Sequence, residues 1–284
     1  MSYLERLDRD LAAAGIRGRR HARILSEFAD HLRCDPDAQL GDPGELARQF
    51  ADELGTVLAR RAAFVAFMGL AVAGLLFGIG FISARRQLFV SASAATPPLG
   101  TLGAWMTVLG AQVAFVAGGL AALRALRRRS QGVISRDEAG VLTRRAAVGV
   151  GAGLVTMAGF GLSALALRGH VVGWWTTLAL SLASAGILTL LAATPAVLAA
   201  ARLRPLAAGS AGDLYVDFGP FVPRALHGRP WRFALAVAGT IVVVIAAVGI
   251  VQSDPFDGAL RAVADGLACL VGFGVLGRFL GLRS

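Results

Sequence analysis

The sequence is poor in the residues that build catalytic and metal centres. Its 284 residues include 2 cysteines, 4 histidines and no lysine. Cys34 falls in the charged N-terminal part and Cys269 in the last apolar run, which excludes a disulfide framework. None of the histidines has a metal-ligand spacing to a cysteine, an aspartate or another histidine. The motifs of zinc peptidases, serine hydrolases and P-loop proteins are also missing, so we predict a non-enzymatic protein with no metal and no cofactor.

Acidic residues are scarce outside the N-terminal part. The whole chain has 28 basic residues, all arginine, against 18 acidic residues, for a formal net charge of +10. Residues 1–61 contain 10 arginines and 11 acidic residues, whereas residues 62–284 contain 18 arginines and 7 acidic residues. A nucleic-acid-binding face needs an excess of positive charge on a soluble domain. The excess here flanks apolar runs, which is typical of membrane helices and predicts no direct nucleic-acid partner.

Long apolar runs dominate the rest of the chain. Hydrophobic residues make up 56% of the sequence and the mean hydropathy is +0.65, whereas an ordinary soluble domain is about 45–50% apolar. The run Ala62–Ser83 contains no charged residue, and as a helix it would reach roughly 33 Å, enough to cross a hydrocarbon core of about 30 Å. We predict an all-α polytopic membrane protein, with a cytoplasmic helical domain of residues 1–61 (the head) and a six-helix transmembrane bundle of residues 62–284. The predicted spans are residues 62–83, 102–123, 146–167, 174–200, 233–251 and 258–281.

The distribution of arginine between the connecting segments predicts the orientation. If the head is cytoplasmic, the cytoplasmic loops and tail hold 14 of the arginines that follow it, and the opposite side holds the remaining 4. Basic residues concentrate on the cytoplasmic side of membrane proteins. We therefore expect a multi-pass protein of the cytoplasmic membrane with both termini in the cytoplasm.

Three amphipathic helices are predicted in the head, which is small for a self-sufficient core. A capping box of Ser2 and Glu5 marks the start of the first helix. Asp42 and Pro43 mark the start of the third, and Gly55 interrupts it before the first span. The apolar faces of these helices are the candidate partner-binding surface, with Tyr3, Leu7, Leu11, Phe28, His31 and Phe50 as its residues.

Three segments of the head carry a recognisable pattern: YLERLDRDL (residues 3–11), RILSEFADHL (residues 23–32) and LGDPGELARQFADELG (residues 40–55). Together they resemble the HAAS domain, a helical signalling domain associated with winged-helix regulators. They are similar too to the permease-prefix domain found ahead of some bacterial membrane proteins. The resemblance covers residues 3–58 and implies a cytoplasmic sensing or adaptor module, often encoded near a PadR-like transcription regulator, with no catalytic residues. The lysine-free composition fits a GC-rich bacterial genome of the actinobacterial kind.

Few polar residues lie at membrane depth, and each is a candidate site. Gln112 lies in the middle of the second span, where we predict a hydrogen bond between helices; the alternative is a transport-site ligand. Asp257, Arg261 and Asp265 follow at four-residue steps on one helix face. They form either a solvated ladder at a helix start or the entry of an ion or substrate. The late loop of residues 202–232 lies in the headgroup layer or docks on the head. Its interfacial candidates are Tyr215, Phe218, Phe221 and Trp231.

Small residues recur at helical spacing within the spans. Gly149 and Gly153 stand one turn apart in a glycine-rich run that superficially resembles a nucleotide-binding loop, but no strand precedes it. Close backbone approach between helices explains such steps, which predict a compact bundle or a homodimer without distinguishing the two. The other steps are Gly74 and Gly78 in the first span, Gly110, Ala114 and Gly118 in the second, and Gly277 and Gly281 in the sixth.

These patterns together predict a membrane-anchored signalling or adaptor protein. Its head binds a cytoplasmic protein, either a transcription regulator of the PadR type, as the resemblance implies, or a transporter subunit. The near-neutral charge of the head favours a protein over DNA. The alternative is a permease-like transporter subunit or accessory protein, which a polar cavity around Gln112 and Asp265 would favour. Membrane lipids are the other expected partner.

Overall fold

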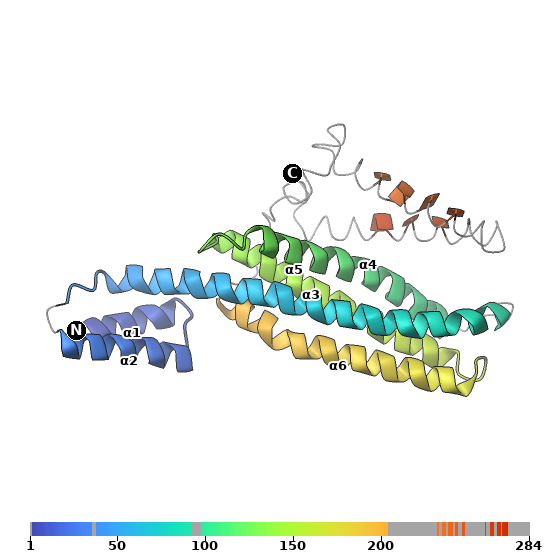
Figure 1. The fold of residues 1–284 in the computed structure, drawn as a ribbon, viewed down its shortest axis with the longest axis horizontal. Helices are drawn as coiled ribbons and strands as arrows, with labels where there is room; N and C mark the ends of the chain where they lie inside the picture. The colour runs from blue at the N-terminus through green and yellow to red at the C-terminus, as the bar shows by residue number, and fades with distance from the viewer. Residues whose placement is uncertain are drawn as a thin grey trace.

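The computed structural model describes residues 2–35, 38–91 and 98–203, together with scattered positions between 232 and 271. Within these ranges the regular structure is helical and contains no β-strand, which confirms the all-α prediction there (Figure 1). The helices are α1 (Tyr3–Ala13), α2 (Arg19–Cys34), α3 (Pro43–Ser91), α4 (Pro98–Arg127), α5 (Arg136–Ala166) and α6 (Gly173–Leu203). The pair α1 and α2 lies beside the start of α3, and the remaining helices form an elongated bundle with the rest of α3 (Figure 1).

Four of these helices, α3 to α6, are long and apolar enough to cross a membrane. They coincide with the first four predicted spans, because a run of about 20 apolar residues has the length of the hydrocarbon core. The chain is therefore a membrane protein by the length and composition of its helices. The spans predicted at residues 233–251 and 258–281 fall outside the described residues, apart from the scattered positions, so the count of six and the orientation stay predictions.

The helix starts in the head are stabilised as predicted. The hydroxyl of Ser2 accepts a hydrogen bond from the backbone N–H of Glu5 at 3.2 Å, and the Glu5 carboxylate accepts one from the Ser2 N–H at 2.9 Å. This reciprocal pair is the capping box. At the start of α3 the carboxylate of Asp42 accepts from the N–H of Glu45 at 2.9 Å, and Pro43 is the first helical residue. Both predicted caps are confirmed.

α3 is one helix of 49 residues, about 73 Å long at roughly 1.5 Å per residue. The predicted interruption at Gly55 is wrong, because Gly55 is buried inside the unbroken helix. The first predicted span, which ends at Ser83, lies within this helix, and the helix itself continues to Ser91. A glycine costs a helix interior about 1 kcal/mol relative to alanine. Packing on both sides of the glycine decides the conformation here, as it does for most helices in proteins.

The connection between the second and third predicted spans, residues 124–145, is shorter than predicted. Both α4 and α5 extend into it, so that only residues 128–135 form the turn. Arg124 and Arg145 are consequently helical, and both are buried. Their long side chains therefore belong to the packing between helices rather than to a solvated loop.

α4 and α5 meet backbone to backbone at glycines, a contact that we call the α4–α5 seam. A Cβ atom added at Gly159 would lie 2.7 Å from the carbonyl oxygen of Gly103, and one at Gly149 would lie 3.2 Å from the backbone nitrogen of Gly118. Because such short distances leave no room for a side chain, the small-residue prediction is confirmed for these two helices. Gly74 and Gly78, predicted to pack in the first span, behave differently, since a Cβ added at either would have no atom within 4 Å.

The head has a small core of its own. Its buried residues are Leu7, Leu11, Ile16, Ile24, Ala47 and Ala51. Phe28 and Phe50 both pack on this core. Their rings meet each other edge to face, with centroids 6.1 Å apart. Leu203, the last residue of α6, packs on the same core. The head therefore contacts the bundle through the end of α6 as well as through α3.

Candidate functional site

One end of the bundle joins it to the head. Here α3 passes from the head into the bundle, the turn between α4 and α5 lies against α3, and α6 ends nearby (Figure 1). We call this region the junction. It consists of Asp52, Thr56 and Arg60 of α3, the turn of residues 128–135, and Arg136 at the start of α5.

Thr56 fixes the turn to α3. Its hydroxyl donates a hydrogen bond to the carbonyl oxygen of Asp52 at 2.8 Å and accepts one from the backbone N–H of Ile134 at 3.0 Å. The residue is 1% exposed. Without this acceptor the N–H of Ile134 would be buried and unpaired, which typically costs about 1–3 kcal/mol. One threonine hydroxyl thus joins two segments that lie far apart in the sequence.

Arg60 holds the turn that follows α4 from a different helix. Its Nη2 donates to the carbonyl oxygen of Arg128 and, at 2.6 Å, to that of Gln131. Both carbonyl groups lie beyond the last residue of α4, and one guanidinium has enough donors to satisfy them together. Arg60 therefore ties α3 to the turn.

Ion pairs complete the junction. Arg136 pairs with Asp52 at 2.9 Å and links α5 to α3. Glu138 pairs with Arg124 at 3.2 Å and with Arg128 at 3.1 Å, which links α5 to the end of α4. The side chains of Arg124 and Glu138 are 10% and 11% exposed. Because water and salt screen a shielded pair less than a surface pair, this pair contributes more than an exposed one would.

An apolar cluster of mostly small side chains lies beside the polar contacts. It consists of Ala59, Ala63, Ala121, Ala125, Ile134, Ala139 and Leu142, and therefore draws on α3, α4, the turn and α5. Alanines let the helices approach closely, and interiors packed in this way have little room for one helix to slide past another. The junction therefore positions α3 relative to both neighbours.

The arrangement is suited to holding helices. Six charged side chains at the junction pair with one another or with backbone carbonyl groups: Asp52, Arg60, Arg124, Arg128, Arg136 and Glu138. In the part of the chain that the structure describes, no group of three or more His, Cys, Asp or Glu side chains gathers where a metal ion could bind.

The predicted partner-binding residues divide into buried and accessible ones. Leu7 and Leu11 are 0% exposed, so they form the core of the head and cannot contact a partner while it is folded. The accessible remainder consists of the half-buried Tyr3, Phe28 and Phe50 and the exposed His31.

Tyr3 illustrates how these half-buried residues are held. Its phenolic O–H donates to the carbonyl oxygen of Leu40 at 3.3 Å. Burial raises the pKa of Tyr3, and the nearby carboxylate of Asp42 raises this pKa further. The neutral phenol is therefore the form that fits the folded head.

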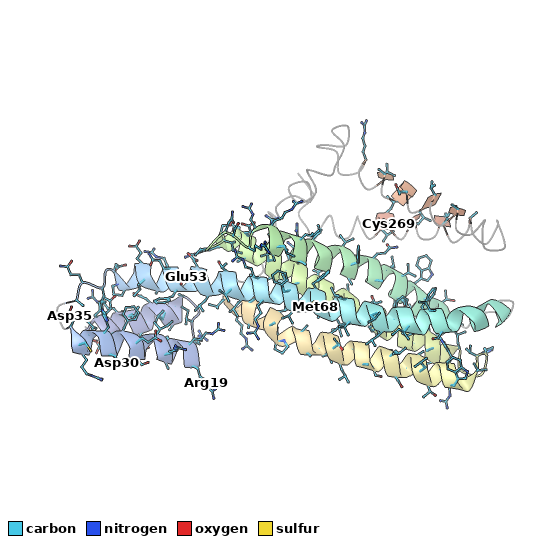
Figure 2. All side chains as sticks on the ribbon, in the orientation of Figure 1. Arg19, Asp30, Asp35, Glu53, Met68 and Cys269 are labelled. Atoms are coloured by element: carbon cyan, nitrogen blue, oxygen red, sulfur yellow. The ribbon has the colours of Figure 1, made fainter. Side chains whose placement is uncertain are left out.

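The outer face of α2 is charged. Arg23 pairs with Glu27 at 2.8 Å, and Arg33 pairs with Asp30 at 3.1 Å, with all four side chains exposed. Figure 2 shows Arg19 and Asp30 on this outer side of α2. A surface of mixed charge suits a polar protein partner, and it lies next to the accessible aromatic residues.

The candidates at membrane depth are only partly visible. The Oε1 atom of Gln112 is buried and has no hydrogen-bond partner among the described residues, so the predicted hydrogen bond between helices is not found at this atom. The other candidates lie outside the described residues: Arg261, Asp265, Tyr215, Phe218, Phe221 and Trp231. The docking of the late loop on the head therefore stays a prediction.

Reasoning from the sequence missed the junction. It did not single out the turn of residues 128–135, which docks on α3. A signal was present, because Asp52, Thr56 and Arg60 stand at four-residue steps and therefore share one face of a helix. That face holds a carboxylate, a hydroxyl and a guanidinium beside an arginine-rich turn.

Comparison of the chain with protein-family models, with curated proteins and with solved structures found no match. The resemblance of the head to the HAAS and permease-prefix domains therefore stays a prediction that rests on the residues quoted above.

Proposed function

We propose that the chain is a membrane-anchored, non-enzymatic signalling or adaptor protein whose cytoplasmic head binds a protein partner. One observation carries the proposal: a single helix, α3, belongs both to the core of the head and to the bundle. The partner that the resemblance implies is a PadR-like transcription regulator.

The junction supplies the coupling that such a protein needs. Asp52, Thr56 and Arg60 bind α3 to the turn and to α5, while Leu203 brings the end of α6 onto the head. A shift of α3 within the bundle would have to break these contacts or carry α1 and α2 with it. Packed helices that move as units are a common way to pass a change from one site to another.

The surface of the head favours a protein as the partner. Residues 1–61 hold nearly equal numbers of basic and acidic residues, and four of the exposed charges on α2 form two ion pairs. DNA binding needs an excess of basic groups that can neutralise phosphates. A partner with its own mixed charge could exchange these surface pairs for pairs across an interface.

A truncation that removes residues 2–41 tests the proposal. It deletes α1 and α2 but leaves α3 from Pro43 onwards, and with it the junction contacts. Full-length and truncated proteins carrying a C-terminal tag are purified from membranes in mild detergent, and the co-purifying proteins are identified. We expect the full-length protein to retain a soluble winged-helix regulator and the truncated protein to lose it. Recovery of the same membrane proteins, and no regulator, with both forms would contradict the proposal.

A charge swap provides the matched control for the fold of the head. The double substitution Arg23→Glu with Glu27→Arg preserves the exposed pair, with the acidic residue first, which is the better order in a helix. The head should therefore keep its stability. If the outer face of α2 contacts the partner, capture of the regulator should weaken because the charge pattern is reversed.

The alternative, a permease-like transporter subunit, has one observation in its favour. The Oε1 atom of Gln112 is buried without a partner, as a ligand-binding amide would be in an empty site. A cavity of about 330 Å³ between α3, α4 and α5 argues against it, because the lining of this cavity is almost entirely apolar and does not include Gln112. We therefore favour the adaptor.

A further inference from the structure

A cavity of about 330 Å³ lies inside the bundle, bounded by α3, α4 and α5. We call it the bundle cavity. Its volume falls within the roughly 300–1,000 Å³ of sites that hold small ligands. Residues of α3 that line it include Phe67, Leu70, Gly74 and Phe77; Phe115 and Gly119 line it from α4. From α5, Gly153, Thr156 and Met157 complete the lining.

The chemistry of this lining excludes a polar occupant. Thr156 carries the hydroxyl of the lining, and that hydroxyl donates to the carbonyl oxygen of Ala152 at 2.9 Å. Water needs two to four polar partners to occupy a cavity, and the single hydroxyl oxygen of Thr156, which can still accept a hydrogen bond, is too few. An empty space of this volume would be costly, since its lining would lose dispersion contacts. The occupant must therefore be apolar.

The cavity is a local feature and not the result of loose packing throughout. The neighbouring α4–α5 seam is so tight that a Cβ at Gly159 would collide with the backbone of α4. Gly74 and Gly119 face the cavity instead, and a Cβ at either would have no atom within 4 Å. The same residue type thus closes one contact and leaves the other open.

The position of the cavity identifies the apolar molecule. The cavity lies within three helices that are long and apolar enough to span a membrane, where the surrounding medium is hydrocarbon. Phe115, which is 78% exposed, and Phe67, which is 38% exposed, mark its opening towards that medium. Arg127 is exposed where α4 ends, about three helical turns beyond Phe115 along the chain. A cation at that end complements a phosphate headgroup.

We propose that the bundle cavity binds one acyl chain of a membrane phospholipid, inserted between α3 and α4 until it reaches α5. This site goes beyond the proposed adaptor function and does not depend on the partner of the head. The floor of the cavity distinguishes it from ordinary lipid contact: Met157 is 1% exposed, so from the membrane a chain reaches it only through the cavity.

Photolabelling of the full-length protein tests the site. The protein is reconstituted in nanodiscs with a phospholipid that carries a diazirine near the end of one acyl chain, illuminated, and analysed by peptide mass spectrometry. We expect label on Met157 or Thr156 at the floor, in addition to label on exposed side chains such as Phe115. Label confined to exposed side chains would overturn the proposal, whether the cavity is empty or filled by another part of this chain or by a second copy.

Two substitutions that fill the cavity sharpen the test. Gly74→Leu on α3 and Gly119→Leu on α4 each add a side chain whose Cβ would have no atom within 4 Å, so each variant should fold. Gly78→Leu is the matched control, because it adds the same side chain one turn further along α3 at a position that does not line the cavity and is equally open. Floor labelling should fall to background in the first two variants and persist in the control. Floor labelling that is equal in all three variants would also overturn the proposal.

Discussion

The junction and the α4–α5 seam hold helices together by different means. At the junction, helices are joined by directed contacts: the Thr56 hydroxyl, the Arg60 guanidinium and the pair of Arg136 with Asp52. In the seam, the backbones of α4 and α5 touch at glycines, and the contact depends mainly on shape, with a hydrogen bond at 3.4 Å from the Ser163 hydroxyl to the carbonyl oxygen of Gly100 beside it. The difference follows from the surroundings, because hydrocarbon offers no hydrophobic driving force between helices and leaves close packing to hold them.

The comparison predicts different kinds of sensitivity. A change of shape should do the most damage in the seam, whereas the loss of a single polar atom should matter most at the junction. The following substitutions test this ranking, in order of decreasing expected effect.

Gly159→Leu should have the largest effect. The added side chain would meet backbone atoms of α4 within 2.8 Å on two sides, and backbone cannot move away as a side chain can. Overpacking costs about 1–3 kcal/mol where neighbours can relax, and more where they cannot. We expect little folded protein in detergent, measured by size-exclusion chromatography of a fluorescent fusion.

Gly151→Leu on the same helix is the control for that substitution, because a Cβ there has no atom within 4 Å. It should elute as the unaltered protein does. Equal loss of folded protein in the two variants would show that helix propensity, and not the seam, is responsible.

Thr56→Val should have the next largest effect. Valine has nearly the same shape but cannot accept from the N–H of Ile134, so the cost should be about 1–3 kcal/mol. Thr143→Val is the matched control: Thr143 is also fully buried, but its hydroxyl donates only to Ala139 in its own helix. The thermal midpoint in detergent should fall clearly further for the first variant. Equal midpoints would mean that the turn is not held through Thr56.

Gln112→Leu should change stability in the opposite direction. Removing a buried amide oxygen that lacks a partner should stabilise the protein by about 1 kcal/mol, seen as a rise of the thermal midpoint. Gln131→Leu, at an exposed position in the turn, should bring no such gain. A loss of stability in Gln112→Leu would show that the amide makes a contact outside the described residues, and would strengthen the transporter alternative.

Tyr3→Phe should have the smallest effect and show it only at high pH. Because the folded pKa of Tyr3 is raised above the ordinary tyrosine value of 10.0, the folded state holds the phenolic proton more tightly than the unfolded state does. The stability that this contributes is present below pH 10 and is lost as the pH rises through the folded pKa. The Phe variant should lack this alkaline loss, which circular dichroism of the protein at rising pH would measure. Identical alkaline curves would contradict the assignment.

Local features of the sequence predicted most of the described helices. The caps at Ser2 and Asp42, the first four spans and the small-residue contacts between α4 and α5 all follow from spacing and residue type over a few turns. The error at Gly55 has a physical cause: a rule about single residues says where a helix can stop, and packing made the helix continue.

The junction could not be predicted in the same way. The four-residue steps at Asp52, Thr56 and Arg60 place three polar groups on one face, but they do not say which segment meets that face. Thr56 and Ile134 are 78 positions apart, and no local pattern relates them. The glycines show the same limit, because Gly74 and Gly159 look alike in the sequence and have opposite surroundings in the structure.

The amino-acid sequence by itself determined that the four long segments are helical and that they belong in a membrane, because hydrogen bonding along the chain and apolar length are local quantities. Tertiary structure alone decided that α3 is unbroken, that the turn of residues 128–135 is held by Thr56 and Arg60, and that a cavity remains beside Gly74. These outcomes depend on how the surfaces of separate helices fit, and that fit arises only when distant segments pack together.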